Sequence, residues 1–358
     1  GDYTSISSWE SSANRNSDAD IWKGTCSDTT DHSAAVTFNS GGTPSATSYL
    51  WLTSDAYCPT PDSGNRGGSY TGGDAQMWWV QDDYMRIEKL DMTATTIDST
   101  NRLIFLDGTL NCLISRCLIW NSDAAVNGGY GVHAANSSVT VAIDNCAIFG
   151  WGLAGLSGND FSFGATQNWN LDHNTIVDNG DSAGTEDGNI MCNTWNSSNY
   201  TLAMYNNIVV GSGGPDEINS GYTQTTGTSD ITGSHNAYTS SAEIDAGWTD
   251  SATSWQSATS GGVTGTKASG SWICYVLYDV GDVPDTMDVT LVAGAGNLAV
   301  EGGTDRQGSE PDARQDFSLD IGGGDRGTVN VDIGASAISL DLSIPVLFHH
   351  YRQQMVGA

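Results

Sequence analysis

The 358-residue sequence predicts an all-β solenoid, in which short strands wind into stacked coils. A segment with one pattern of apolar residues recurs about every 28 residues, which indicates a repeat architecture. Glycine is frequent, at 44 residues, and Ser, Thr, Asn and Asp abound, so turns and strands are favoured over helices. The 12 Trp and 13 Tyr residues indicate a packed interior, because disordered acidic chains are poor in aromatics.

The repeat is clearest in four segments that align without gaps. Each has apolar residues at its first, third and eighth positions and Cys or Asn at its sixth. The segments begin at Cys112, Val141, Trp169 and Leu202, and weaker copies begin at Met85 and Ile231. Their sixth positions are Cys117, Cys146, Asn174 and Asn207, separated by 29, 28 and 33 residues.

This pattern has a simple physical explanation. Alternation at the first and third positions is typical of a strand with one buried face, and the polar pair that follows turns a corner into a second strand. Asn suits such a corner because it tolerates left-handed backbone and its amide can stack on the next coil. We therefore predict that the four sixth-position residues form a ladder with Cα atoms about 4.8 Å apart. Stacked free thiols are favoured there over a Cys117–Cys146 disulfide. A leucine-rich repeat would need a Leu spacing and helical segments that this sequence lacks.

The repeats over residues 75–340 resemble those of right-handed parallel β-helix proteins of the pectate-lyase-like superfamily, which includes lyases, phage tailspikes and adhesins. The segment Asp2–Glu10 resembles the opening of uncharacterised β-helix proteins from phages and environmental bacteria. Asp320–Arg326, followed by Val331–Ala335, is similar to the closing coil of secreted members. The resemblance implies the architecture and no single activity, because this fold carries enzymes, adhesins and inert scaffolds.

The chain is expected to form one β-helix domain with specialised ends. Residues 1–75 are assigned to an N-terminal cap and the first coils, and the helical spacing of apolar residues within 2–12 predicts a short amphipathic lid. Residues 76–340 form the β-helix, with long loops expected at 215–270. Residues 341–358 are expected to be a C-terminal extension.

The charge balance excludes several kinds of partner. Lys+Arg is 12 against 42 Asp+Glu, for a formal charge of −30. Such a surface repels phosphate backbones and anionic lipids, so we expect no nucleic-acid partner, and polyuronate substrates are disfavoured. No stretch approaches 18 apolar residues, so we expect no membrane insertion.

Acidity with only three lysines favours an extracellular, cell-surface or virion location. The seven cysteines leave at least one thiol without an intrachain partner. The start at Gly1 has neither an initiator Met nor a signal peptide, so a processed or truncated chain is expected.

Asp144 and Asp172 occupy the same repeat position on neighbouring coils. Stacked carboxylates can bind Ca²⁺ or act as an acid–base pair. A solvated outer face is the simpler interpretation. The resemblance implies that a lyase would carry calcium-binding aspartates near a basic residue, whereas Arg116 has no repeated acidic cluster beside it. Arg116, Asn145, His173 and Asn206 fall on the corner, where hydrogen bonding is expected.

A second candidate site combines acidic and aromatic residues. Asp82 and Asp83 lie beside Trp78 and Trp79, which together could stack on and bind a sugar. The simpler interpretation is that Met77–Val80 is a buried strand.

Two further structural roles are predicted near the C-terminus. Arg326 lies six residues from both Asp320 and Asp332, so a partly buried ion pair is expected to hold the last turns. The tail is too apolar to be left in water, so its apolar residues are expected to contact an adjacent subunit, with packing on the chain's own last coil as the alternative. These residues are Ile344, Val346, Leu347 and Phe348.

No residue is assigned a catalytic role, and no cofactor is expected apart from an optional Ca²⁺. The function expected from the sequence is therefore non-catalytic: a self-associating structural subunit of a filament, spike or decoration layer, with glycans as an optional partner. The alternatives are a polysaccharide-degrading enzyme, such as a tailspike depolymerase, and a glycan-binding adhesin.

Overall fold

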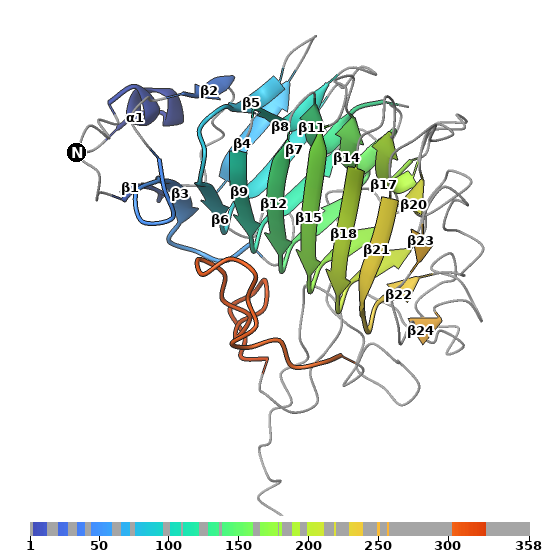
Figure 1. Ribbon diagram of the computed structural model, residues 1–358. Helices are drawn as coiled ribbons and strands as arrows, with labels where there is room; N and C mark the ends of the chain where they lie inside the picture. Colours follow the sequence, from blue (N-terminus) through green and yellow to red (C-terminus); the bar gives the residue numbers. More distant parts are fainter. Residues whose placement is uncertain are drawn as a thin grey trace, which may run out of the picture.

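The computed structural model confirms the predicted fold class, because the described residues form a parallel β-solenoid with a single helix, α1 (Ile6–Ser12) (Figure 1). The structure describes residues 3–12, 21–27, 34–39, 44–58, 66–71, 76–95, 101–108, 110–121, 128–135, 138–159, 165–177, 179–180, 188–193, 199–210, 218–219, 229–238, 249–250, 256–257 and 303–326. Within these residues, no helix is long and apolar enough to cross a membrane.

Three sheets run along the solenoid, and all pairs of neighbouring strands are parallel. Sheet 1 consists, in spatial order, of β1 (Trp22–Cys26), β3 (Leu50–Ser54), β6 (Met85–Glu88), β9 (Leu110–Ser115), β12 (Val139–Asp144), β15 (Thr166–Asp172), β18 (Asn199–Tyr205), β21 (Ser229–Ser234) and β23 (Thr249–Asp250). Sheet 2 consists of β4 (Arg66–Thr71), β7 (Asp91–Thr95), β10 (Leu118–Asn121), β13 (Ala147–Phe149), β16 (Thr175–Val177), β19 (Ile208–Val210), β22 (Ala237–Tyr238) and β24 (Gln256–Ser257). Sheet 3 consists of β2 (Val36–Phe38), β5 (Gln76–Val80), β8 (Arg102–Asp107), β11 (Tyr130–Ala135), β14 (Ala154–Asn159), β17 (Gly188–Asn193) and β20 (Ile218–Asn219).

The register of sheet 1 matches the alignment of the repeats. Cys112 pairs with Val141, Val141 with Trp169, and Trp169 with Leu202 on β9, β12, β15 and β18. The side chains at these positions point into a continuous apolar core, which also receives the inward faces of the other two sheets. A single coil could not bury its apolar face, so stacking stabilises every coil.

In six successive coils, the corner between sheets 1 and 2 is made by one residue in the left-handed region. Its φ lies between 54° and 59° in Lys89, Arg116, Asn145, His173, Asn206 and His235. Left-handed backbone is costly for residues other than Gly, Asn and Asp, so neighbouring contacts must hold it in place. The Lys89 ammonium lies over the ring of Tyr57. The side chains of Arg116, Asn145, His173 and Asn206 make the hydrogen bonds described below.

The residue after each corner belongs to a buried ladder. The N–H of Cys117 lies 3.4 Å from Cys146 Sγ, the N–H of Cys146 donates to Asn174 Oδ1 at 3.0 Å, and the N–H of Asn174 donates to Asn207 Oδ1 at 2.9 Å. Asn236 continues the ladder beyond Asn207. Cys117 and Cys146 are free thiols. The buried amides thus provide hydrogen bonds inside an apolar core, where unpaired backbone groups would be costly.

The helix predicted within residues 2–12 is confirmed as α1. Ile6 and Trp9 are buried and belong to the core, and the Trp9 ring lies directly on Gly24. The side chain of Ser5 accepts a hydrogen bond from the N–H of Ser8, which satisfies a donor of the first turn. The helix therefore lies against the N-terminal end of the solenoid.

One prediction about the later chain differs from the structure, and two stay predictions. Residues 303–326, which we call the strap, form turns and one isolated bridge between Leu319 and Asp325 rather than a closing coil. They lie along the corner of sheet 1 instead of stacking on its end (Figure 1). Within 215–270, the described residues form the short strands β20 to β24, which continue the sheets, and the long loops expected between them lie outside the described residues. The predicted extension at 341–358 lies outside the described residues.

Candidate functional site

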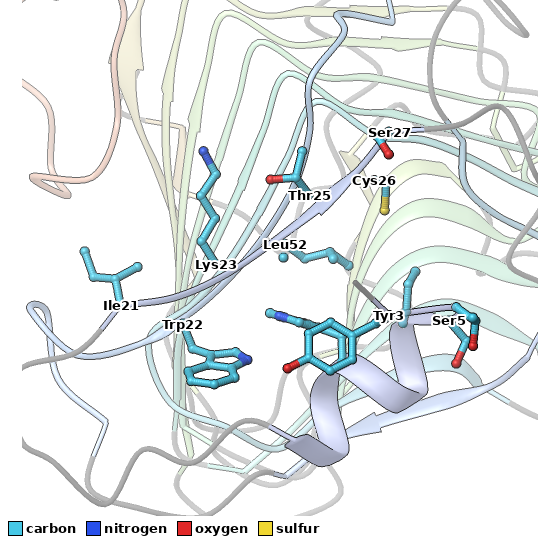
Figure 2. A pocket seen from close by; sticks show the side chains of 13 residues that line it. Tyr3, Ser5, Ile21, Trp22, Lys23, Thr25, Cys26, Ser27 and Leu52 are labelled. Carbon is cyan, nitrogen blue, oxygen red and sulfur yellow. The ribbon is translucent and has the colours of Figure 1, made fainter. Parts of the chain in front are cut away.

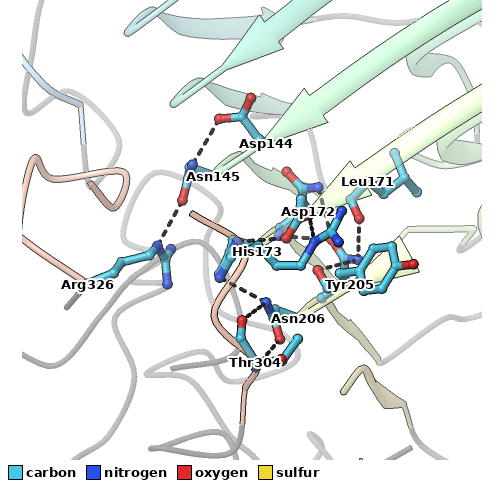
Figure 3. A network of polar contacts seen from close by, with 12 residues as sticks. Asp144, Asn145, Leu171, Asp172, His173, Tyr205, Asn206, Thr304 and Arg326 are labelled. Carbon is cyan, nitrogen blue, oxygen red and sulfur yellow. Dashed lines mark hydrogen bonds and ion pairs between the residues drawn. The ribbon is translucent and has the colours of Figure 1, made fainter. Parts of the chain in front are cut away.

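The densest polar cluster in the described structure is the corner beneath the strap, shown in Figure 3. At one end of the strap, Thr304 and Asn206 exchange two hydrogen bonds of 2.8 Å, one from each residue's N–H donor to the other's oxygen. Near the middle of the strap, Arg314 Nη1 donates to the carbonyl oxygen of Tyr84 at 2.7 Å. The strap therefore reaches from β18 back to the start of β6 and spans several coils.

Under the strap, the fourth position of each repeat forms a row along the end of sheet 1. The strand register places its members next to one another. They are Glu88, Ser115, Asp144, Asp172 and Tyr205. Three carboxylates, those of Glu88, Asp144 and Asp172, thus share one edge, and each has a different set of partners.

Asp144 is fully buried, with 0 % of its surface exposed. It accepts hydrogen bonds from Ser115 Oγ at 2.7 Å, Asn145 Nδ2 at 2.9 Å and Gln315 Nε2 of the strap at 3.1 Å. Burial raises the pKa of Asp144, while the charge of Arg116 and these hydrogen bonds act in the opposite direction.

Asp172 is held by an arginine of the strap. Arg306 Nε donates to Asp172 Oδ2 at 3.0 Å, and the Arg306 guanidinium stacks 3.7 Å from the centre of the Tyr205 ring. On the other side, His173 Nδ1 lies 2.8 Å from Asp172 Oδ1. The strap thus closes over Asp172, which is only 3 % exposed.

His173 is buried between Asp172, Asn206 and the ring of Phe317. Asn206 Nδ2 donates to His173 Nε2 at 3.0 Å, which leaves the proton of a neutral imidazole on Nδ1, beside Asp172. Burial, followed by the charge of Arg326, lowers the pKa of His173. The imidazole is therefore neutral at pH 7 and serves as a hydrogen-bonding bridge between two coils.

Arg116 does have acidic partners, which corrects the sequence interpretation. Its Nη1 lies 2.7 Å from Glu88 Oε1 on the preceding coil, and its Nη2 donates to the carbonyl oxygen of Asp316 at 2.6 Å. Glu88 sits in the weaker repeat copy that begins at Met85, at the same position as Asp144. Asp316 comes from the strap, 200 residues away in sequence, and no repeat pattern points to it.

The solvated outer face expected for Asp144 and Asp172 is therefore wrong, because the strap buries both. An acid–base pair also fits poorly, since Arg306, Gln315 and Ser115 already bind the carboxylates. In the part of the chain that the structure describes, no three His, Cys, Asp or Glu side chains gather as a metal site. The expected hydrogen-bonding role of the corner residues Arg116, Asn145, His173 and Asn206 is confirmed.

Arg326, the last described residue of the strap, also contacts this corner. Its Nε donates to Asn145 Oδ1 at 3.0 Å, and the residue is buried. The Asp320 carboxylate accepts the N–H of Gly324 in the turn that leads to Arg326. Asp332 lies outside the described residues, as do Ile344, Val346, Leu347 and Phe348. The ion pair and the assembly role assigned to these residues therefore stay predictions.

The aromatic patch at β5 is mostly interior. Trp78 is fully buried edge-on against Phe38, and Asp82 is 5 % exposed, so burial excludes both from contact with a sugar. The alternative interpretation of this segment as a buried strand is correct for Met77, Trp78 and Val80. Asp83 Oδ1 accepts hydrogen bonds from both nitrogens of Asn111.

Trp79 points to the other face of sheet 3 and is partly exposed. Its Nε1 donates to Asp107 Oδ2 at 3.0 Å, and its ring lies 6.1 Å from that of Phe105. Phe105 in turn stacks on His133. Since Phe105 and His133 are buried, this aromatic row packs the outer face of sheet 3.

Comparison with known proteins adds no relative to this description. No protein-family model matches the chain, and no curated protein or solved structure is significantly similar to it. The fold of this chain as a parallel β-solenoid thus rests on its own repeats and sheet topology.

Proposed function

We propose that this chain is a non-catalytic structural subunit that self-associates in a filament, spike or decoration layer outside the cell or on a virion. The observation that carries the proposal is the strap: it occupies the row of carboxylates that the sequence singles out for chemistry. Asp144 accepts a hydrogen bond from Gln315 of the strap, and Asp172 accepts one from Arg306, so the two carboxylates attach the strap to the coils.

The mechanical properties of the fold support this role. Parallel coils joined by a continuous buried amide ladder form a rigid, elongated body. The strap ties coils that are distant along the axis, from Asn206 to Tyr84. With a net charge of −30, copies repel one another except where a surface is locally complementary. Specific, directional association is therefore favoured over aggregation.

The proposal includes membership of the pectate-lyase-like β-helix superfamily, among secreted and phage proteins. It requires no cofactor, although an acidic surface accommodates Ca²⁺. An enzyme or a glycan-binding adhesin of the same fold would need an accessible row of carboxylates or aromatic rings.

Electron microscopy of the native assembly, together with light scattering of the purified chain, tests the proposal. We expect ordered polymers or arrays, and a mass above that of the 37.6 kDa chain that rises with concentration. The purified chain should release no reducing sugar from neutral or acidic polysaccharides. A chain that stays monomeric at all concentrations, or that cleaves a polysaccharide, overturns the proposal.

A further inference from the structure

The N-terminal end of the solenoid is only partly covered by α1. The Trp9 ring sits on Gly24 so closely that a Cβ at this glycine would lie 2.6 Å from Trp9 Cε2. Glu10 accepts the N–H of Asn39, which attaches the helix next to β2 of sheet 3. The helix thus protects the core and the sheet 3 side, whereas sheet 1 ends with β1.

The outer edge of β1 offers backbone hydrogen-bonding groups. The N–H of Trp22 donates to the carbonyl oxygen of Tyr49, and the carbonyl oxygen of Cys26 accepts the N–H of Asp55. In a parallel ladder alternate residues bond to the same neighbour, so Trp22, Gly24 and Cys26 face β3. The N–H and C=O groups of Lys23 and Thr25 therefore point away from β3. Among the described strands, β1 has β3 as its single neighbour.

A hollow of about 620 Å³ runs along this edge (Figure 2). One wall is residues 21–27, and the other is Tyr3–Ile6 with Trp9. Two large apolar side chains stay exposed at its rim, Tyr3 at 41 % and Ile21 at 46 %. Single exposed apolar residues are common, but here two lie beside a strand edge that pairs with no other described strand.

The hollow also contains buried donors. Trp9 is 4 % exposed and lines the hollow, and its Nε1 has no hydrogen-bond partner in the described structure. Trp22 Nε1 is likewise buried without a partner among the described residues. Buried indole N–H groups normally find an acceptor, so these two donors are unsatisfied within the described structure, although neither nitrogen is open to the hollow.

Charge indicates what kind of chain fits. The residues that line the hollow include Lys23, whose ammonium lies 4.1 Å from the centre of the Trp51 ring beside the hollow, and no Asp or Glu, although the whole chain carries −30. An acidic, extended segment is therefore attracted to this end and repelled elsewhere. A second copy of this chain is such a partner.

The opposite end of sheet 1 supplies a matching edge. There β23 (Thr249–Asp250) pairs with β21, and among the described strands it has no other neighbour. Because all strands of sheet 1 run parallel, the outer edge of β23 can meet the outer edge of β1 on another copy with the strands still parallel. The sheet would then continue from one molecule into the next.

We propose that the β1 edge and its hollow are the receiving surface for the β23 end of a second copy, so that subunits stack head to tail. Such a heterologous contact does not close on itself and produces a filament. Backbone hydrogen bonds to Lys23 and Thr25 supply the pairing, and Lys23 selects the acidic partner. This inference rests on the proposed self-association and names its surface.

The test compares full-length variants by sedimentation velocity and light scattering over a range of concentrations. Thr25→Pro removes an N–H that points away from β3, so it leaves the internal ladder intact, and Thr25→Val is the matched control that keeps this N–H. Lys23→Glu reverses the charge at the hollow, and Lys267→Glu makes the same charge change elsewhere in the sequence. Thermal melting and circular dichroism verify that each variant folds.

We expect Thr25→Pro and Lys23→Glu to associate about tenfold more weakly or worse, while both controls match the unmodified chain. Carbodiimide coupling of mixed light and heavy-isotope chains should join Lys23 to a carboxylate near residues 249–250 of another copy. If the unmodified chain associates and the two β1 variants associate equally well, the inference fails and the proposed function stands. If the unmodified chain never associates, both fail.

Discussion

Arg306 Nε donates a hydrogen bond to Asp172 Oδ2 at 3.0 Å across 134 residues of sequence, and this contact joins the strap to the solenoid. The Asp172 side chain is 4 % exposed and that of Arg306 is 18 % exposed, so solvent screens the pair only partly. Several other polar contacts also hold the strap against the coils.

Replacing Arg306 with Ala should lower the free energy of unfolding by about 1–3 kcal/mol, because the buried Asp172 carboxylate loses a charged donor. Asp172→Asn should lower the free energy of unfolding less in the Arg306→Ala variant than in the unmodified chain, because the Asp172 carboxylate has already lost its arginine partner. Urea denaturation of the four proteins measures the coupling. Ser309→Ala, an exposed position of the strap, is the control. Additive effects of the two substitutions would show that the pair contributes nothing.

The asparagine ladder should be among the most sensitive parts of the core. Asn207→Ala removes donors to the carbonyl oxygens of Leu171 and Tyr205 and the acceptor for the N–H of Asn174. Unsatisfied buried groups cost about 1–3 kcal/mol each, so we expect a loss of several kcal/mol and a lower melting temperature. Asn174→Cys, which imitates Cys146, should be milder than Asn174→Ala because sulfur still accepts an N–H. Equal melting temperatures for the two Asn174 variants would contradict the ladder.

The Arg116–Glu88 pair should behave as a buried ion pair. Both side chains are 3 % exposed and lie 2.7 Å apart. Arg116→Asn keeps a residue that tolerates left-handed backbone and should cost about 3 kcal/mol by leaving Glu88 undercompensated. Glu88→Gln introduced into Arg116→Asn should restore part of this loss. Calorimetry decides: a double variant that is less stable than Arg116→Asn would show that the glutamate acts through another contact.

Acid should weaken the protein through His173. Burial lowers its pKa, so as the pH falls below about 6.5 the unfolded chain binds a proton that the folded chain does not. The stabilisation is therefore present above the unfolded pKa and is lost as the pH falls toward the folded pKa. One imidazole changes the unfolding free energy by at most about 1.4 kcal/mol per pH unit.

His173→Asn, which matches Asn145 and Asn206 at the same corner position, should flatten this dependence between pH 7.5 and 5.5. The charged groups that face His173 are Asp172, Arg306 and Arg326, and all of them stay in the variant. His133 also has a pKa lowered by burial, and it cancels in the comparison. Identical slopes of melting temperature against pH would show that His173 does not titrate in this range.

The predicted assembly role of the apolar tail has its own test. Deleting the chain after Asp341 removes Ile344, Val346, Leu347 and Phe348. If the tail contacts a neighbouring subunit, light scattering should give a smaller assembly for the deleted chain, because each large buried side chain contributes about 1.5–3 kcal/mol. A truncated chain that assembles like the intact one, with an unchanged melting temperature, would leave the tail without either predicted role.

The sequence by itself determined the coils, their register and the ladder. These features depend on contacts between equivalent positions of neighbouring repeats, such as Cys146 and Asn174, so a periodic pattern displays them directly. The capping helix was predictable for a similar reason, because Ile6 and Trp9 recur at helical spacing within a few residues. The left-handed corner at Asn145 was also visible, because Asn is one of the few residues that favour that backbone.

Only the tertiary structure decided which polar residues are buried. Asp144 and Asp172 occupy the same position of the repeat. The sequence pattern at this position is the same whether water or protein covers the side chains. The covering residues Arg306, Gln315 and Asp316 lie 134 to 200 residues from their partners and follow no period. Their position depends on how a non-repetitive segment folds back over the corner. The periodic sequence therefore shows the coils, whereas the non-repetitive strap determines that Asp144 and Asp172 are buried and hydrogen-bonded within the chain.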